Sequence, residues 1–222
     1  MPTSLYSLIE MSFPADRSKV AIEVPDRARG RVSWTFAELA GATARAASLF
    51  AGLGLKHGDR VAVQAEKSPE ALIAYLACLR GGFVFLPMNT AYRTDEVDYL
   101  VGNAEPALII CDPAREADTR EMAGRHGTAH VLTLDAEGFG SFSEAAAKVR
   151  DAAPVADCAS SDLAAILYTS GTTGKPKGAM LSHGNLAANG IALRDSWRFT
   201  EDDVLLHALP IFHAHGLFVA CH

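Results

Sequence analysis

Hydrophobic positions along the chain alternate between short apolar runs and longer amphipathic stretches. The short runs predict strands at residues 19–24, 31–34, 59–65, 83–86, 107–112, 130–134 and 163–168. The amphipathic stretches predict helices at residues 35–50, 68–80 and 143–150, and others that begin at 94, after 113 and near 182. Strands that alternate with helices of roughly ten residues are typical of parallel β-α-β units. The pattern therefore predicts a layered α/β fold in which helices cover the sheet.

Local signals mark the ends of several of these helices. Thr35 and Glu38 have the spacing of a capping box, in which each side chain bonds the other residue's backbone N–H. Ser68, Pro69 and Glu70 supply a cap residue, a first-turn proline and an acid near the positive helix end. Glycines follow both of these helices and predict their ends, at residues 52 and 54 and at residues 81 and 82.

Residues 151–162 interrupt the alternation with small and polar side chains, and we interpret them as a linker-like connection. On this basis residues 1–150 form a first α/β subdomain. Residues 163–222 begin a second, incomplete one. The apolar run at 216–222 has no cap or turn and is interpreted as a strand without its neighbours, so we expect the chain to be truncated.

Composition and charge exclude some classes of function. The chain has 222 residues, is 49% hydrophobic and 21% charged, and carries a formal net charge of −6. This balance gives no basic surface for nucleic acid or an anionic membrane. The longest apolar run, 71–79, is too short to span a bilayer. The four cysteines are far apart and form no C-x-x-C pair, which excludes a zinc ribbon and favours free thiols in the cytoplasm.

The segment YTSGTTGKPKG at 168–178 concentrates hydroxyl side chains, glycines and lysines. Glycines let backbone N–H groups approach a polyphosphate, hydroxyls donate to phosphate oxygens, and lysines supply point charges. The segment has neither the Walker P-loop spacing nor the G-x-G-x-x-G of dinucleotide-binding folds. A flexible surface loop of small residues is the alternative. Its position directly after an apolar strand favours a ligand site.

In its setting AILYTSGTTGKPKGAMLSHGNL, this segment resembles the phosphate-binding signature of the adenylate-forming superfamily. That superfamily comprises acyl-CoA synthetases, luciferase-like enzymes and peptide-synthetase adenylation domains. A second block about thirty residues downstream, HALPIFHAHGLF, resembles the next motif of the family. The preceding segments VSWTFAELA, GDRVAVQAEKSPEALIAYLACLRGGFVFLPMNTAY and ALIICD follow the family's order. The resemblance implies the amino-terminal part of the large domain, with layered αβα subdomains.

The resemblance also implies a chemistry for the loop. A carboxylate attacks the α-phosphorus of ATP, pyrophosphate leaves, and coenzyme A thiol then displaces AMP from the acyl-adenylate. ATP, Mg²⁺ and coenzyme A are the implied ligands, with a small carboxylic acid as the substrate. By resemblance, the residues that hold the β- and γ-phosphates of ATP are Thr169, Ser170, Gly171, Thr172, Thr173, Gly174, Lys175 and Lys177.

Histidines of the second block are further candidates. His213 matches the aromatic position that flanks the acyl pocket and the coenzyme A tunnel in the family, and His207 is assigned to the same region. With His215 they could instead bind zinc, but their spacing is not a standard ligand pattern, and we assign no metal ligand here. Packed, hydrogen-bonding histidines are the third possibility.

Substrate choice rests on two segments, FLPMNTAYRTDEVDYLVGNAEP and LRDSWRFTEDDVLLHALPIFHAHGLF, which resemble malonyl-CoA synthetases. An acid–thiol ligase for malonate, with a role in fatty acid metabolism, is the leading interpretation. Another acyl-CoA synthetase, an adenylation domain or a non-catalytic ATP-binding fragment is the alternative. Arg194 and Arg198 could bind a second carboxylate, although a solvated helix face suits them better. We expect the catalytic residues beyond residue 222, and therefore no turnover by this chain alone.

Overall fold

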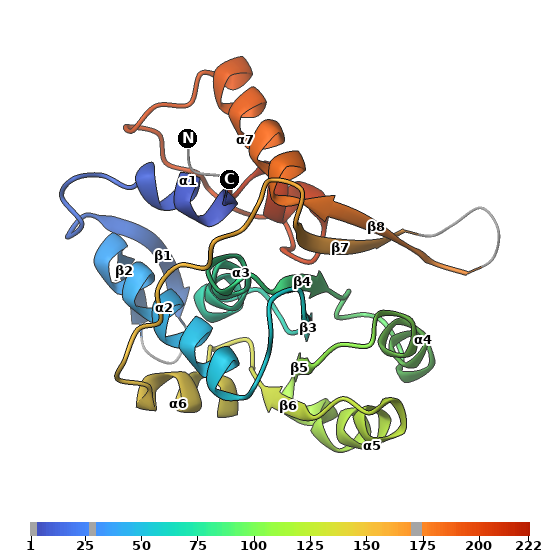
Figure 1. Ribbon diagram of the computed structural model, residues 1–222. Helices are drawn as coiled ribbons and strands as arrows, with labels where there is room; N and C mark the ends of the chain where they lie inside the picture. Colours follow the sequence, from blue (N-terminus) through green and yellow to red (C-terminus); the bar gives the residue numbers. More distant parts are fainter. Residues whose placement is uncertain (1–3, 27–29, 170–174) are drawn as a thin grey trace.

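A computed structural model describes residues 4–26, 30–169 and 175–222. In this part of the chain, six strands form one sheet in the order β6-β5-β3-β4-β7-β8 (Figure 1). The first five strands are parallel, and β8 runs antiparallel to β7. The strands are β3 (Arg60–Gln64), β4 (Val84–Pro87), β5 (Leu108–Cys111), β6 (His130–Thr133), β7 (Leu163–Thr169) and β8 (Lys177–Ser182).

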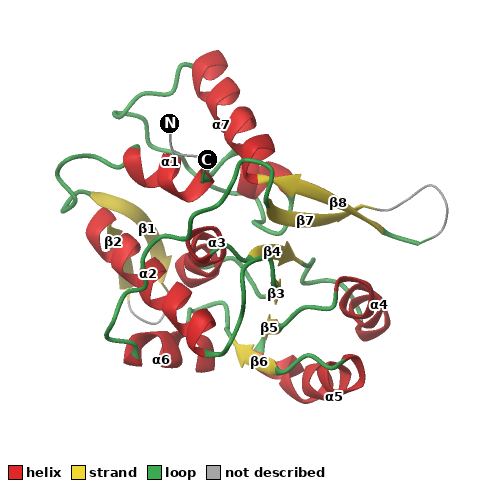
Figure 2. Ribbon diagram, viewed as in Figure 1, coloured by secondary structure: helices red, strands yellow, loops and turns green. Residues whose placement is uncertain are grey.

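Helices cover both faces of this sheet, as Figure 2 shows. The helices on one face are α2 (Phe36–Gly52), α3 (Pro69–Gly81) and α6 (Ser141–Lys148), and those on the other are α4 (Thr94–Ala104) and α5 (Glu116–His126). Alternate positions of β3 serve the two faces, because successive side chains of a strand point to opposite sides. Val61 and Val63 pack with α2 and α3, whereas Ala62 packs with α4 and α5. The predicted layered α/β fold is confirmed.

Most of the remaining elements lie on the α2–α3 side of the sheet. The hairpin of β1 (Val20–Asp26) and β2 (Gly30–Thr35) precedes α2. Helix α1 (Leu5–Met11) lies beside α7 (His183–Trp197) and α3 (Figure 1). A short 3-10 helix, η1 (Pro113–Arg115), leads into α5, and a π-helical turn, η2 (His215–Val219), packs against α7. Among the described residues, no helix combines the length and the apolarity that crossing a membrane requires.

The predicted helix caps are present. Glu38 donates its backbone N–H to the Thr35 hydroxyl (3.2 Å), and its carboxylate accepts from the Thr35 N–H (2.8 Å). The Ser68 hydroxyl accepts from the N–H of Ala71 at 3.1 Å. Helix α3 ends at Gly82, whose φ of 72° lies in the left-handed region that glycine favours. These ends are determined by contacts within a few residues, which is why the sequence predicted them.

Three local predictions differ from the structure. Residues 177–182, expected as loop, form strand β8. Their backbone pairs with that of β7, from the Thr169–Lys177 pair at one end of the ladder to the Leu163–Ser182 pair at the other. The apolar run expected as a terminal strand is instead the turn η2, whose Leu217 and Phe218 are buried. Helix α1 was not predicted, and it is held by burial of its first two residues. For α1 and η2, packing against distant segments outweighed weak local signals, and for β8 pairing with the neighbouring strand did so.

The connection at 151–162 is held against the end of α3. Arg80 donates from its guanidinium to the carbonyl oxygen of Ala153 (3.0 Å), and Ala156 N–H donates to the Arg80 carbonyl oxygen (2.8 Å). Strand β7, which follows this connection, joins β4 in the same sheet. The division into subdomains at these residues stays a prediction.

Candidate functional site

The carboxyl ends of the parallel strands meet at one edge of the sheet, and the lysine- and hydroxyl-bearing loop begins there. Thr169 ends β7 and Lys177 begins β8, and these two residues are paired in the antiparallel ladder. Ligands of open α/β sheets bind outside this edge because the connecting loops converge there. Thr169, Lys175 and Lys177 are all exposed, so their polar groups can reach a ligand. Five expected phosphate-binding residues lie outside the described residues: Ser170, Gly171, Thr172, Thr173 and Gly174.

Helix α4 holds both ends of this loop. On the β7 side, the Tyr168 hydroxyl donates to Oδ1 of Asn103 at 2.5 Å. On the β8 side, the Tyr99 hydroxyl donates to the carbonyl oxygen of Pro176 at 3.2 Å. The ammonium group of Lys175 lies 5.4 Å from the centroid of the Tyr99 ring, within the range of a cation–π contact. Tyr99 and Asn103 are four residues apart, so they occupy the same face of α4.

The surroundings of Tyr168 also raise the pKa of its phenol. Burial raises the pKa of the Tyr168 phenol, and the proximity of the Tyr99 phenol raises it further. Tyr168 therefore stays protonated and remains a hydrogen-bond donor to Asn103 at neutral pH. The contacts of Tyr168 and Pro176 with α4 are thus made by neutral, hydrogen-bonded groups. The charges at the loop come from the exposed side chains of Lys175 and Lys177.

The second block, residues 207–218, lies at the same edge of the sheet. Lys67, just after β3, donates from Nζ to the carbonyl oxygens of His207 (2.9 Å) and Leu209 (3.1 Å). Beside this contact is a small, mostly apolar pocket between the ends of β3 and β4, the start of α3 and the second block. The pocket is lined by Val63, Ala65, Ala71, Phe85, Pro87, Ile211 and Phe212. This edge therefore presents the polar loop and an apolar recess.

The histidines of the second block have different surroundings. His207 donates from Nε2 to the carbonyl oxygen of Gly216 (2.8 Å), so its ring holds η2 in place. His213 is exposed, and its ring centroid lies 4.6 Å from that of Phe212, a residue of the apolar pocket. Within the described part of the chain, His207, His213 and His215 do not form a group that could hold one metal ion.

Arg194 and Arg198 lie on an exposed surface, as expected for a solvated helix face. Arg194 donates to the carboxylate of its neighbour Asp195 at 2.8 Å. Arg198 follows α7 in the left-handed conformation, with φ of 58°. Neither residue is part of the apolar pocket.

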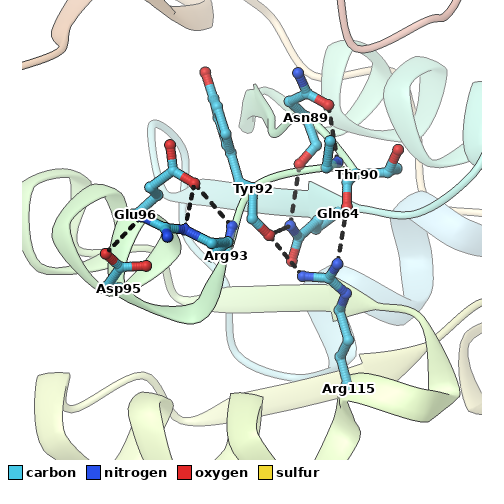
Figure 3. A network of polar contacts seen from close by, with 9 residues as sticks. Gln64, Asn89, Thr90, Tyr92, Arg93, Asp95, Glu96 and Arg115 are labelled. Carbon is cyan, nitrogen blue, oxygen red and sulfur yellow. Dashed lines mark hydrogen bonds and ion pairs between the residues drawn. The ribbon is translucent and has the colours of Figure 1, made fainter.

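A polar network at this edge was missed by the sequence analysis (Figure 3). Arg115 donates to the carbonyl oxygens of Tyr92 (2.7 Å) and Thr90 (2.9 Å). Gln64 donates from its amide to the carbonyl oxygens of Asn89 (3.0 Å) and Tyr92 (3.2 Å). These four bonds fix the turn at 89–92 after β4. The available signal was Gln64, a polar residue that directly follows the apolar run 61–63 at the carboxyl end of β3.

The described groups suit a polyphosphate. Two lysines and a threonine hydroxyl supply charge and hydrogen-bond donors at the two ends of one loop, and α4 limits the movement of both ends. Donors that are fixed before a ligand arrives lose less conformational entropy on binding. The apolar pocket nearby has room for no more than about one water molecule, so it marks an apolar surface beside the loop and not a formed acyl site.

Comparison with known proteins agrees with this geometry. Residues 13–222 match the family described as AMP-binding enzyme. The fold matches the crystal structure of ATP-bound MatB from Rhodopseudomonas palustris with a TM-score of 0.90 and 49% identity, over 100% of this chain and 43% of that one. Feruloyl-CoA synthase from an Amycolatopsis species is 31% identical over 95% of this chain, and oxalate–CoA ligase from Arabidopsis thaliana is 33% identical over 89%.

The chain spans 40% of the length of both of these curated relatives. It matches the amino-terminal domain of adenylate-forming enzymes, so the resemblance drawn from the two sequence motifs is confirmed. The relatives named here are ligases or synthases that form CoA thioesters, and enzymes of this family use ATP and coenzyme A. This chain belongs to the family of AMP-binding enzymes.

Proposed function

We propose that this chain binds ATP through the loop between β7 and β8 and takes part in converting malonate to malonyl-CoA. The observation that carries the proposal is the loop itself, whose Thr169, Lys175 and Lys177 are exposed at the carboxyl edge of the sheet. It is supported by the likeness to a protein whose structure contains ATP. The reaction runs through an acyl-adenylate, with pyrophosphate released in the first half-reaction and AMP in the second.

Each described loop residue has a role in this proposal. The ammonium groups of Lys175 and Lys177 neutralise the β- and γ-phosphates and stabilise pyrophosphate as it leaves. The Thr169 hydroxyl donates to a phosphate oxygen, and the hydroxyls and amides of residues 170–174 complete the cradle. Tyr99 and Asn103 act indirectly, since they hold the two ends of the loop. A fixed polyphosphate presents its α-phosphorus to the incoming carboxylate, and this positioning lowers the activation barrier.

Magnesium is part of the same proposal. The described loop ends offer ammonium groups and a hydroxyl but no carboxylate, so the donor set fits the phosphates rather than a resident ion. The ion would be held mainly by phosphate oxygens, where it would neutralise charge. Coenzyme A enters as the second substrate.

Malonate is the proposed acid because MatB, which is 49% identical to this chain, is a malonyl-CoA synthetase. Curated relatives at 31–33% identity are named for other acids, including ferulate and oxalate. An aryl or dicarboxylic acid other than malonate is therefore the second candidate. The two candidates share the adenylation chemistry and differ only in the acyl pocket.

Pyrophosphate exchange in the natural protein that carries this chain tests both the chemistry and the acid. We expect malonate to give the fastest exchange, methylmalonate a slower one, and acetate, ferulate or palmitate slower exchange still. Preference for ferulate or palmitate would reject malonate and leave the adenylation proposal intact. Absence of exchange with every acid would reject adenylation itself.

Lys175 gives the sharpest test of the loop. Replacing it with alanine removes one charge-assisted contact, worth about 1.5–3 kcal/mol, and should lower kcat/KM for ATP by about 10- to 100-fold. The control is Lys148→Ala, which removes an exposed lysine at the end of α6. Equal activity of the two variants would contradict a role for the loop in ATP binding.

His213 and His207 are proposed to border the acyl pocket and the path of the coenzyme A arm. His213 is the better candidate because it is exposed beside Phe212, whereas His207 bonds Gly216. We expect His213→Ala to raise KM for coenzyme A and, because the acyl pocket holds the acid, to raise KM for malonate in pyrophosphate exchange as well. His215→Ala is the matched control, since His215 is also exposed. The same KM in both variants would argue against His213.

Two further points belong to this proposal. Because the chain spans 43% of the matching MatB chain, a preparation of residues 1–222 alone is expected to form no malonyl-CoA. AMP formation by that preparation above background would contradict this. A cytoplasmic location is supported by the four cysteines, Cys78, Cys111, Cys158 and Cys221, which are all free thiols.

A further inference from the structure

A second group of reactive side chains lies at the opposite edge of the sheet from the loop. His57 comes just before β3, and Cys158 and Asp162 come just before β7, at the amino ends of these parallel strands. Each residue offers one possible metal-ligating atom, and the three atoms all lie within 4.8 Å of one another. The proposed ATP chemistry uses none of these residues.

The spacing suits a tetrahedral ion. Nε2 of His57 and Oδ2 of Asp162 are 3.3 Å apart. Two such ligands, each about 2.0–2.1 Å from a zinc ion at the tetrahedral angle, would be about 3.3–3.4 Å apart. The nitrogen and the oxygen are therefore already at the separation that zinc requires, and the sulfur of Cys158 lies within 4.8 Å of both.

The backbone around these ligands holds them in place. Ala159 N–H donates to Oδ2 of Asp162 (2.9 Å), and Asp162 N–H donates to the Ala159 carbonyl oxygen (3.1 Å), which closes a turn beside Cys158. The His57 ring lies against Gly82, where an added Cβ would be 2.5 Å from Nδ1. Three segments distant in sequence therefore converge before any ion binds.

His183, whose backbone contacts Asp162, is not one of the three grouped ligands. Its backbone N–H donates to the Asp162 carbonyl oxygen (2.9 Å), and the residue is fully buried. Nδ1 of its ring accepts from the N–H of Leu5 (3.2 Å), so the proton of the neutral ring is on Nε2. A protonated nitrogen cannot bind a metal. The fourth position is therefore left to water.

An ion could enter from solvent because the side chains of His57 and Asp162 are 51% and 35% exposed. One sulfur, one nitrogen and one oxygen form a donor set that suits zinc. Magnesium and calcium bind oxygen ligands, so this set does not suit them. The competing interpretation is an ion pair of His57 and Asp162 beside an unreactive buried thiol.

We propose that His57, Cys158 and Asp162 bind one Zn²⁺ ion, with water as the fourth ligand. Cys158 binds as the thiolate, and its proton passes to solvent on binding. The ion cross-links the connection at 151–162 to the segment before β3. The site is therefore a structural metal site at the edge of the sheet opposite the ATP loop.

The test is titration of the metal-free natural protein that carries this chain with Zn²⁺, and with Co²⁺ as a coloured probe. We expect one ion per chain and a thiolate-to-cobalt charge-transfer band that Zn²⁺ abolishes by displacement. Cys158→Ser and His57→Gln should each weaken Zn²⁺ binding by at least about 10-fold. Cys221→Ser is the matched control, because the Cys221 sulfur also lies near a histidine, 3.6 Å from Nε2 of His207. This variant should keep full affinity and the band.

Asp162→Asn keeps the proposal testable if the cysteine variant folds poorly. Its amide oxygen can still accept from Ala159, so the turn survives, while the lost charge should weaken Zn²⁺ binding by about 10-fold. Added Zn²⁺ should raise the Tm of the native chain but not that of Cys158→Ser. The proposal is overturned if no ion binds stoichiometrically, if the cobalt complex lacks the thiolate band, or if Cys221→Ser abolishes binding. The first of these results would leave the ion pair as the correct interpretation.

Discussion

The Tyr168 hydroxyl donates to Oδ1 of Asn103 at 2.5 Å, although the two residues are 65 positions apart. Tyr168 is the last residue but one of β7, and Asn103 lies near the end of α4. The bond fixes the strand one residue before the loop begins. Together with the contact of Tyr99 to Pro176, it holds the loop at both ends from one helix.

Removing this bond should affect ATP binding more than folding. A single hydrogen bond contributes about 0.5–1.5 kcal/mol, so Asn103→Ala should raise KM for ATP by about 2- to 10-fold. Asp98→Ala is the matched control, because Asp98 is on the same helix but pairs with Arg125 of α5 (2.6 Å). ATP titrations of both variants in the natural protein provide the measurement. A KM for Asn103→Ala equal to that of the control would show that the contact between α4 and the loop does not affect ATP binding.

The raised pKa of Tyr168 predicts an alkaline effect on stability. Burial keeps the phenol protonated in the folded state at a pH where the unfolded chain, with a pKa near 10.0, has lost the proton. The folded state then binds more protons, so stability is intact below pH 10 and falls as the pH rises through the folded pKa. Urea unfolding at pH 9 and at pH 10.5 should show a smaller loss for Tyr168→Phe. Identical losses would contradict the assignment.

Arg115 should be a strong contributor to the stability of the carboxyl edge. Arg115→Ala removes two charge-assisted hydrogen bonds to the turn at 89–92 and should lower the free energy of unfolding by about 1–3 kcal/mol. Arg115→Lys keeps the charge but not the planar fork and should restore only part of the loss. Arg93→Ala is the control, since its side chain is 77% exposed and its ion pairs lie at the surface. Denaturant unfolding would refute the prediction if Arg115→Ala matched Arg93→Ala.

Lys67 should control the mobility of the second block. Lys67→Met keeps the apolar part of the side chain but removes the bonds to His207 and Leu209. Bonds of this kind are worth about 1.5 kcal/mol or more, so amide hydrogen exchange at residues 207–212 should speed up by about 10-fold. Lys148→Met serves as the control on a distant helix. Unchanged exchange at these residues would mean that other contacts hold the block.

The sequence by itself determined the features that depend on neighbouring residues. The alternation of apolar runs and amphipathic stretches predicted the layered α/β fold. The spacing of apolar residues in each segment depends only on whether that segment is a helix or a strand. Thr35 with Glu38, and Ser68 with Pro69, marked helix starts because capping bonds span only three residues. The loop at 168–178 could be recognised for the same reason, as its chemistry lies within one short segment.

Only the tertiary structure decided the features that join distant segments. Strand β8, although it follows β7 closely in the sequence, is a strand only because it pairs with the edge of β7. The turn η2 is helical because α7 and α3 leave an apolar surface beside it. The bracing of the turn at 89–92 by Arg115, and the convergence of His57 with Cys158 and Asp162, bring together residues from separate elements. No local pattern encodes these contacts, because their energy is gained only when the sheet has brought its strand ends together.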